Sequence, residues 1–157
     1  MKKRIVLGGI LIMMVLLPLM AASGSNGTWS AGVNIGTGAQ SAAQYRINED
    51  LDIIMGIGVD FFSDAIYGDV VANYKVTEFN IDKAKFDVTV GGGALIGFYN
   101  SDVELSVVAP AGITYRFDED VIPLDVYLRV GPAIRIIKGY QTDLIGIYSY
   151  IGAMYRF

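Results

Sequence analysis

The amino-acid sequence predicts an all-β fold, an eight-stranded antiparallel up-and-down transmembrane β-barrel. Apolar and polar residues alternate with a period of two from residue 28 to residue 157, and no stretch has the 3.6-residue period of a helix. Short clusters of turn-forming residues separate the alternating stretches. The polar positions carry mostly Gly, Ser, Asn and Tyr with a few charges, which suits a crowded interior better than a water-exposed surface.

The first 23 residues precede this pattern and have the composition of a secretory signal peptide. Lys2–Arg4 provide a positive start, Ile5–Met20 is apolar, and Ala21–Ser23 are small residues suited to a signal peptidase. An uncleaved membrane anchor is the alternative, but the apolar run is shorter than the roughly 20 residues that a spanning helix needs. We therefore expect a cleaved signal peptide at 1–23 and a β-barrel domain at 24–157.

The first half of the domain contains four expected strands, whose apolar residues fall on alternate positions. Leu51–Phe62 has the most regular alternation, because its odd positions are all apolar while Asp52, Gly56, Gly58 and Asp60 occupy even ones. The four expected strands are Thr28–Thr37, Ser41–Asn48, Leu51–Phe62 and Asp69–Phe79.

The second half contains four longer stretches of the same alternation. The expected strands are Lys85–Tyr99, Glu104–Phe117, Leu124–Ile137 and Leu144–Phe157. Turn residues such as Asn48–Asp50 and Phe117–Asp120 join neighbours closely enough to form antiparallel hairpins. Pro110 and Pro132 fall inside two of these strands, where a closed barrel has no free edge, so we expect β-bulges at both prolines.

The direction of the apolar face separates a membrane protein from a soluble carrier. Aromatic residues lie near both ends of the apolar faces, as in the aromatic girdles of a bilayer-embedded barrel. The expected girdle consists of Trp29, Phe61, Phe86, Phe98, Tyr115 and Phe117. Glu78 and Ser149 are the polar exceptions on the expected lipid face, and we expect Glu78 at or below the membrane interface.

The last eight residues, Tyr150–Phe157, contain the most specific motif. Tyr150, Gly152, Tyr155 and Phe157 resemble the assembly signal of bacterial outer-membrane barrels, in which aromatic residues alternate and the last one ends the chain. The resemblance implies recognition by the barrel-assembly machinery, to which the final strand would offer its unpaired edge.

As a whole, residues 28–157 resemble the small eight-stranded barrels of the OmpA and OmpX type. The resemblance implies a bacterial outer-membrane location in the cell envelope, contact with outer-membrane lipid, and both termini on the periplasmic side. The outward loops would then be 38–40, 63–68, 100–103 and 138–143, which are short. We expect no peptidoglycan-binding domain after Phe157, and therefore no OmpA-like anchoring role.

Charged residues on the inward face must be paired, because an isolated buried charge is very costly. We expect Glu104 to pair with Arg135, and Arg116, Asp125 and Arg156 to cluster near the periplasmic end. We also expect Lys75 and Arg129 to reach Asp52, Asp60 or Asp87. The expected lumen network is Asp52, Asp60, Lys75, Asp87, Glu104, Arg116, Asp125, Arg129 and Arg135. A salt-bridged plug and a gated ion path are both open at this stage, and the plug is favoured.

Composition argues against several functions. The chain has 157 residues, no histidine and no cysteine, and a formal net charge of −4. Without histidine it lacks the residue that outer-membrane acyltransferases, phospholipases and proteases use in catalysis, so we expect no enzyme, catalytic residue, cofactor or metal site. The negative charge argues against nucleic-acid binding.

We therefore expect an integral outer-membrane barrel with a plugged lumen and a structural, envelope-maintenance or surface-interaction role. One alternative is a soluble periplasmic lipocalin-like barrel with a hydrophobic ligand inside. The other is a narrow, porin-like ion pore. The sequence names no external partner.

Overall fold

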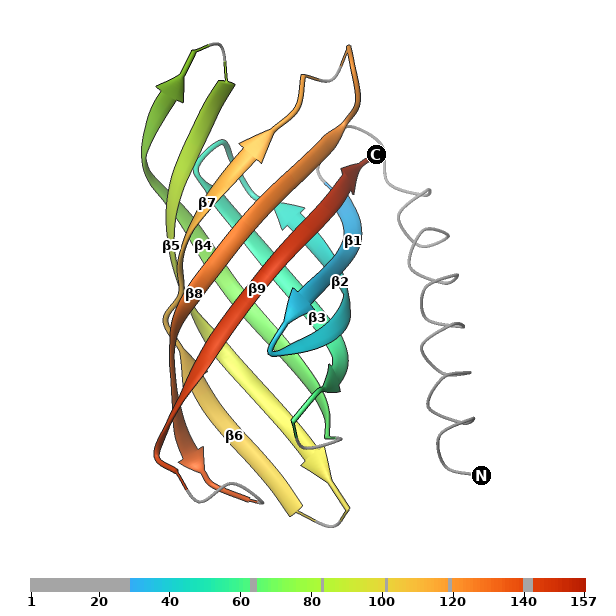
Figure 1. Cartoon of the computed structure of the whole chain (residues 1–157), viewed down its shortest axis with the longest axis vertical. Coiled ribbons are helices and arrows are strands. Elements are labelled where there is room, and N and C mark those ends of the chain that lie inside the picture. The colour runs from blue at the N-terminus through green and yellow to red at the C-terminus, as the bar shows by residue number, and fades with distance from the viewer. Residues whose placement is uncertain (1–28, 63–64, 83, 101, 119, 140–142) are drawn as a thin grey trace.

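The computed structural model describes residues 29–62, 65–82, 84–100, 102–118, 120–139 and 143–157. The expected signal peptide and Thr28 lie outside the described residues. Within the described residues, nine strands form a single antiparallel sheet (Figure 1). The strands are β1 Trp29–Gly36, β2 Gly38–Arg46, β3 Leu51–Asp60, β4 Ile66–Ile81, β5 Ala84–Tyr99, β6 Asp102–Val108, β7 Ala111–Arg116, β8 Leu124–Ile137 and β9 Ile145–Arg156.

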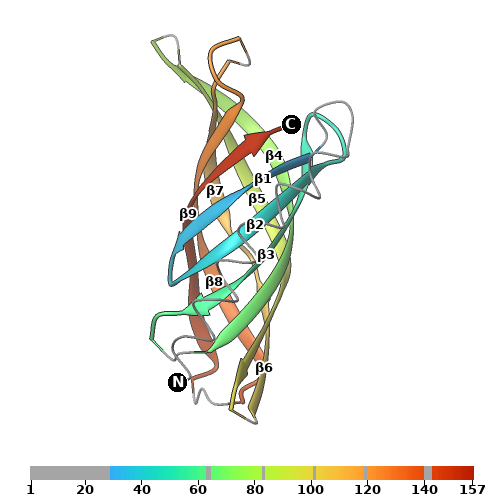
Figure 2. The same cartoon turned by 90° about the vertical axis from the view of Figure 1, so that its right-hand side faces the viewer.

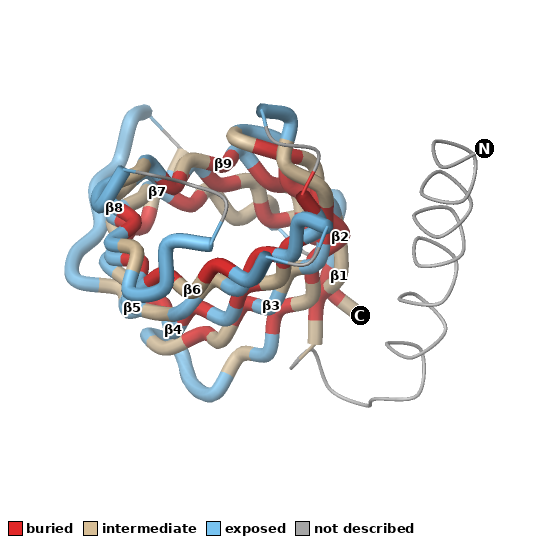
Figure 3. The backbone as a smooth tube through the Cα atoms, turned by 90° about the horizontal axis from the view of Figure 1, so that it is seen from below, coloured by how far each residue is buried: buried red, intermediate tan, exposed pale blue. Residues whose placement is uncertain are grey.

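The sheet closes on itself into a ring. The order is β4-β3-β2-β1-β9-β8-β6-β5-β7, and further pairing of β4 with β5 and of β8 with β7 completes the circuit (Figures 2 and 3). Strands β6 and β7 occupy successive parts of one position between β5 and β8. The ring therefore has eight strand positions, and the first strand, β1, pairs with the last, β9. Trp29 and Phe157 lie at one end of the ring, which we call the terminal end; the opposite end is the far end.

Three expected connections are shorter than predicted. Gly38 to Gln40 belong to β2, where they pair with β3, so only Thr37 joins β1 to β2. Strand β4 begins at Ile66 and β6 at Asp102, so parts of the expected loops 63–68 and 100–103 are also strand. These segments contain small or polar residues with weak alternation, and pairing with a neighbour decides their conformation.

The expectation of bulges at the two prolines is wrong. Val108 pairs with Ala133 and Ala111 pairs with Val130, so the register of β8 is the same on both sides of Pro110. Pro132 lies within β8 without a register shift against β9. Ala109 N–H donates a hydrogen bond to the Pro132 carbonyl. Pro132 has no N–H and therefore cannot donate the second hydrogen bond of this pair to Ala109. The hydrogen-bond ladder is interrupted there, which explains why β6 and β7 are separate strands.

A register shift does occur in β4, between Lys75 and Thr77. The additional residue, Val76, changes which side chains face inward beyond it. Glu78 consequently lies opposite Asp87 and on the same face as this buried residue, so its expected position on the outer face is wrong. One bulged residue is sufficient for this change, because successive strand residues point to opposite faces.

The ring has a polar interior and an apolar exterior. Every strand carries at least one exposed large apolar or aromatic residue on its outer face, and polar or charged residues on the inner face are buried (Figure 3). Exposed examples, one from each strand in order, are Val33, Tyr45, Met55, Val70, Val90, Val107, Ile113, Leu128 and Ile151. Buried examples are Asn34, Gln44, Asp52, Asp69, Asp87, Glu104, Thr114, Asp125 and Arg156.

Candidate functional site

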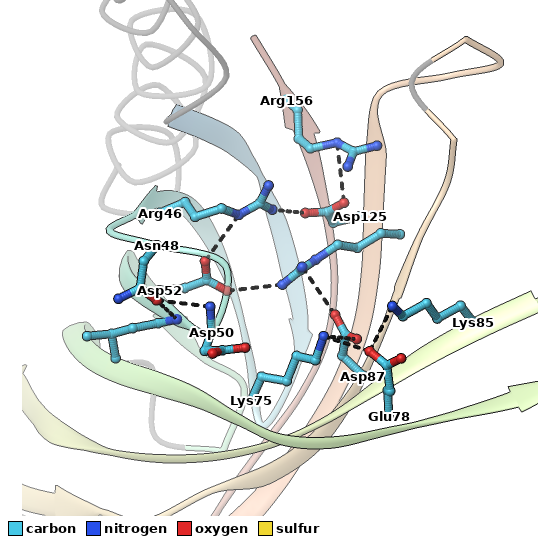
Figure 4. Close-up of polar contacts among 12 residues, drawn as sticks. Arg46, Asn48, Asp50, Asp52, Lys75, Glu78, Lys85, Asp87, Asp125 and Arg156 are labelled. Atoms are coloured by element: carbon cyan, nitrogen blue, oxygen red, sulfur yellow. Dashed lines mark hydrogen bonds and ion pairs between the residues drawn. The ribbon is translucent and has the colours of Figure 1, made fainter.

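A cluster of buried charges fills the interior near the terminal end (Figure 4). We call it the charged cluster; its members are Arg46, Asp52, Lys75, Asp87, Arg116, Asp125 and Arg156. Asp125 lies between Arg46, whose Nη2 is 3.1 Å from it, and Arg156, whose Nε is 3.4 Å away. Arg116 lies 3.2 Å from Asp87 and 3.6 Å from Asp52.

Strand register brings these residues to one level. Arg46 and Asp52 are direct partners between β2 and β3, and Arg116 and Asp125 are direct partners between β7 and β8. The pair between Arg46 and Asp125 then joins strands that are not neighbours in the sheet. The side chains of Asp52, Asp87 and Asp125 are at most 7% exposed. The cluster thus crosslinks the interior and occupies its cross-section at this level.

The charged cluster continues to a solvent-exposed rim on the β4–β5 hairpin, which projects beyond the other strands at the terminal end (Figure 1). The Glu78 carboxylate lies 2.8 Å from Lys75 Nζ and 2.7 Å from Lys85 Nζ. Hydrogen bonds from these two ammonium groups lower the pKa of Glu78 to about 2. Lys75 also reaches Asp87 at 3.2 Å, so it connects the rim to the buried part.

Arg129 occupies the middle of the interior and is 3% exposed. Its guanidinium carbon lies 4.1 Å from the centroid of the Tyr127 ring, which is a cation–π arrangement. Within the described residues no ion pair joins Arg129 to Asp52, Asp60 or Asp87, its expected partners.

Asp69 is a buried carboxylate that is not among the interior charges predicted from the sequence. It accepts hydrogen bonds from Tyr148 Oη at 2.7 Å and from Gln40 Nε2 at 3.4 Å. Between the same two strands, β9 and β4, Tyr150 Oη donates to Tyr67 Oη at 2.8 Å. Because the expected strand began at Asp69, the inward position of this residue was not recognised. The alternation of Asp69 with the outward-facing Val70 is the sequence signal that indicates this position.

A cavity of about 510 Å³ lies in the interior toward the far end. Glu104 and Arg135 form an ion pair in its wall, with 3.0 Å between Oε1 and Nε, and Ser106 Oγ donates to the same Oε1 at 3.1 Å. Tyr148 and Tyr150 also line it, and Asp60 lies at its edge on β3. Glu104 is 5% exposed, and its second oxygen, Oε2, is buried without a hydrogen-bond partner.

Aromatic side chains form a row on the outside of the terminal end. Phe79, Phe86 and Tyr115 contact one another across three strands, with ring centroids 5.3 and 5.2 Å apart, and Phe117 follows at 4.6 Å. Trp29 contacts Tyr45 in the same way at 4.8 Å. At the far end, Phe61 and Phe98 are 56% and 48% exposed.

Three residues of the expected assembly signal, Tyr150, Gly152 and Tyr155, lie in β9, and the fourth, Phe157, directly follows it. Tyr150 and Gly152 face inward and are buried, whereas Tyr155 faces outward and contacts Phe157 at 5.3 Å. A Cβ at Gly152 would overlap Asn34 Oδ1 and the Tyr127 ring, so this glycine makes room for both side chains.

No family model, curated protein or solved structure matches the chain. Among the described residues, none of the groups of acidic side chains is placed to hold a metal ion. The same part of the chain contains no helix of the length and apolarity needed to cross a membrane.

Proposed function

We propose that the protein is an integral β-barrel of the bacterial outer membrane, with a plugged, salt-bridged lumen and a structural or surface-interaction role in the cell envelope. The observation that carries this proposal is the combination of a polar, charged interior with exposed apolar side chains on every strand. A soluble monomer rarely exposes a continuous apolar surface of this extent. In a bilayer the same surface is solvated by lipid, and the ring closes through the pairing of β1 with β9.

The aromatic row supports this proposal and suggests an orientation. Tyrosine and tryptophan side chains favour the interface between lipid headgroups and hydrocarbon. Trp29, Phe86, Tyr115 and Phe117 would mark one interface, and Phe61 and Phe98 the other. With a cleaved signal peptide at 1–23, the terminal end would face the periplasm, where the barrel-assembly machinery would recognise Tyr150, Gly152, Tyr155 and Phe157.

The two alternatives have less support. A lipocalin-like carrier needs an apolar interior, whereas the buried positions here include three carboxylates of the charged cluster. A pore needs a continuous water path, whereas Ile54, Tyr127 and Met154 pack together in the interior at 2% exposure or less. We therefore favour a plug, and a role that does not depend on conduction or catalysis.

Refolding provides the test. Residues 24–157 are refolded with and without uncharged detergent, and β-structure is followed by circular dichroism and by gel mobility before and after boiling. The proposal predicts β-structure and heat-dependent mobility only with detergent. A folded, soluble monomer in plain buffer would overturn it.

A substitution on the outer face makes the test sharper. Leu128 is 46% exposed in the middle of β8, and an arginine there would cost about 2–4 kcal/mol if the side chain faced lipid but almost nothing if it faced water. The matched control is Val121→Arg in the exposed turn after β7, where Val121 is 78% exposed. Equal folding of both variants in bilayers would contradict a lipid-facing β8.

A further inference from the structure

The far end of the ring has a notch in its wall. The β1–β2 hairpin turns at Thr37, whereas the neighbouring strand β9 extends further toward the far end, where it begins at Ile145 (Figure 1). The last contacts are between Gly36 and Tyr150 and from Thr37 N to the Ser149 carbonyl, 3.0 Å apart. Beyond them, residues 145–148 pair with β8 on one side, and among the described residues no strand pairs with their other side.

The notch opens into the cavity. Thr37, at the last contact with β9, and the apolar residues Ile145, Ile147 and Phe62 all line the walls of the cavity. The exposed fractions of Ile145, Ile147 and Phe62 are 65%, 70% and 85%. Under the proposed membrane location, these apolar walls lie on the lipid side. A molecule could therefore enter the cavity sideways from the membrane and keep its apolar part outside.

The cavity itself favours a cation. Among the described residues that line it are two acidic residues, Glu104 and Asp143, besides Asp60, which accepts from Phe62 N, and one basic residue, Arg135, which pairs with Glu104. Glu104 is more than nine-tenths buried, and no group of the described residues donates a hydrogen bond to its Oε2 atom. An unmatched buried carboxylate oxygen is costly, and an ammonium group supplies both charge and N–H donors. The rings of Tyr148 and Tyr150 can add cation–π contacts.

We propose that this cavity binds the ammonium group of an amphiphile that enters through the notch beside residues 145–148 of β9, and that its alkyl chain lies against Ile145, Ile147 and Phe62. A phosphate or carboxylate headgroup is disfavoured by the excess of carboxylates. The volume of about 510 Å³ is within the usual range for small-molecule sites. This inference rests on the proposed membrane location, because only then are the notch walls next to lipid.

The test uses ¹⁵N-labelled protein in uncharged maltoside micelles, after β-structure and heat-dependent mobility have been established. Octylammonium is titrated while the amide signals of Thr37, Gly146 and Tyr148 are followed, with methylammonium and octanoate as probes that lack the chain or the positive charge. We expect saturable shifts with octylammonium and at least tenfold weaker binding of the other two. Equal binding of methylammonium, or stronger binding of octanoate, would overturn the proposal.

Two variants separate the parts of the site. Glu104→Gln keeps the shape and can still accept from Arg135, and it should weaken octylammonium binding about tenfold through loss of one charge-assisted hydrogen bond. Ile147→Ala should weaken octylammonium and leave methylammonium unchanged. Asp120→Asn, in an exposed turn at the terminal end, is the matched control. Unchanged binding in Glu104→Gln would overturn the site, whereas failure of the wild-type chain to fold in micelles would overturn the proposed function instead.

Discussion

Replacement of Asp125 by alanine should destabilise the protein by about 3 kcal/mol. The Asp125 side chain is 1% exposed and lies 3.1 Å from Arg46 and 3.4 Å from Arg156. Removing one member of a buried ion pair typically costs about 3–5 kcal/mol, because the remaining charge stays buried. In Asp125→Ala, Arg46 would still contact Asp52 at 3.4 Å and is 22% exposed, and Arg156 would still donate to the Phe117 carbonyl. The expected loss is therefore at the lower end of this range.

The assay is equilibrium unfolding in urea from uncharged phospholipid vesicles, followed by the fluorescence of Trp29, the single tryptophan. The free energy of unfolding is compared among the wild type, Asp125→Ala, Asp125→Asn and the control Asp120→Ala. Asp120 is exposed, so its replacement should change the free energy by less than about 0.5 kcal/mol. A loss below about 1 kcal/mol in both Asp125 variants would refute the reasoning and show that water solvates the charged cluster.

Three further predictions concern individual residues. Gly152→Ala should cost about 1–3 kcal/mol in refolded protein, measured by the same urea titration, because the added Cβ meets Tyr127; an unchanged midpoint would contradict this packing role. Removal of Phe157 should reduce membrane insertion in cells, measured by heat-dependent mobility of the membrane fraction, far more than refolding into detergent; equal effects would argue against an assembly signal. The carboxyl carbon of Glu78 should titrate in NMR near pH 2, so its stabilising contribution persists above its ordinary pKa and disappears as the pH falls toward 2; a midpoint at the ordinary value would disprove the contact with the two lysines.

The strands were predictable because the period of two extends over nearly the whole domain. Leu51–Phe62 illustrates this, since alternation alone gave β3 to within two residues and placed Asp52 inside. The bulge at Val76 was not predictable in the same way. Val76 and Thr77 together oppose Val88 in β5, and an alternating pattern does not show where one residue is unpaired. The position of Glu78 was consequently wrong.

Partners within the interior depend on register, and register is only partly visible in a single sequence. The pair of Glu104 and Arg135 follows from similar heights on neighbouring strand positions. The contact of Arg46 with Asp125 crosses the ring, so it depends on closure between β1 and β9 and on the stagger that closure imposes. Arg129 was assigned to the wrong carboxylates for this reason, and the cavity could not be anticipated at all.

The distribution of charge between the two ends bears on how such a ring could enter a membrane. Among the described residues, the connections at the terminal end carry Glu49, Asp50, Asp82, Asp118 and Asp120, whereas those at the far end carry Lys138 and Asp143. Each charge that crosses the bilayer centre costs roughly 2.5–3.5 kcal/mol on insertion scales. The far end therefore crosses at much lower cost than the terminal end. Insertion with the far end leading would leave the charged connections and both described chain ends on the side of entry, which is the orientation that the proposed function requires.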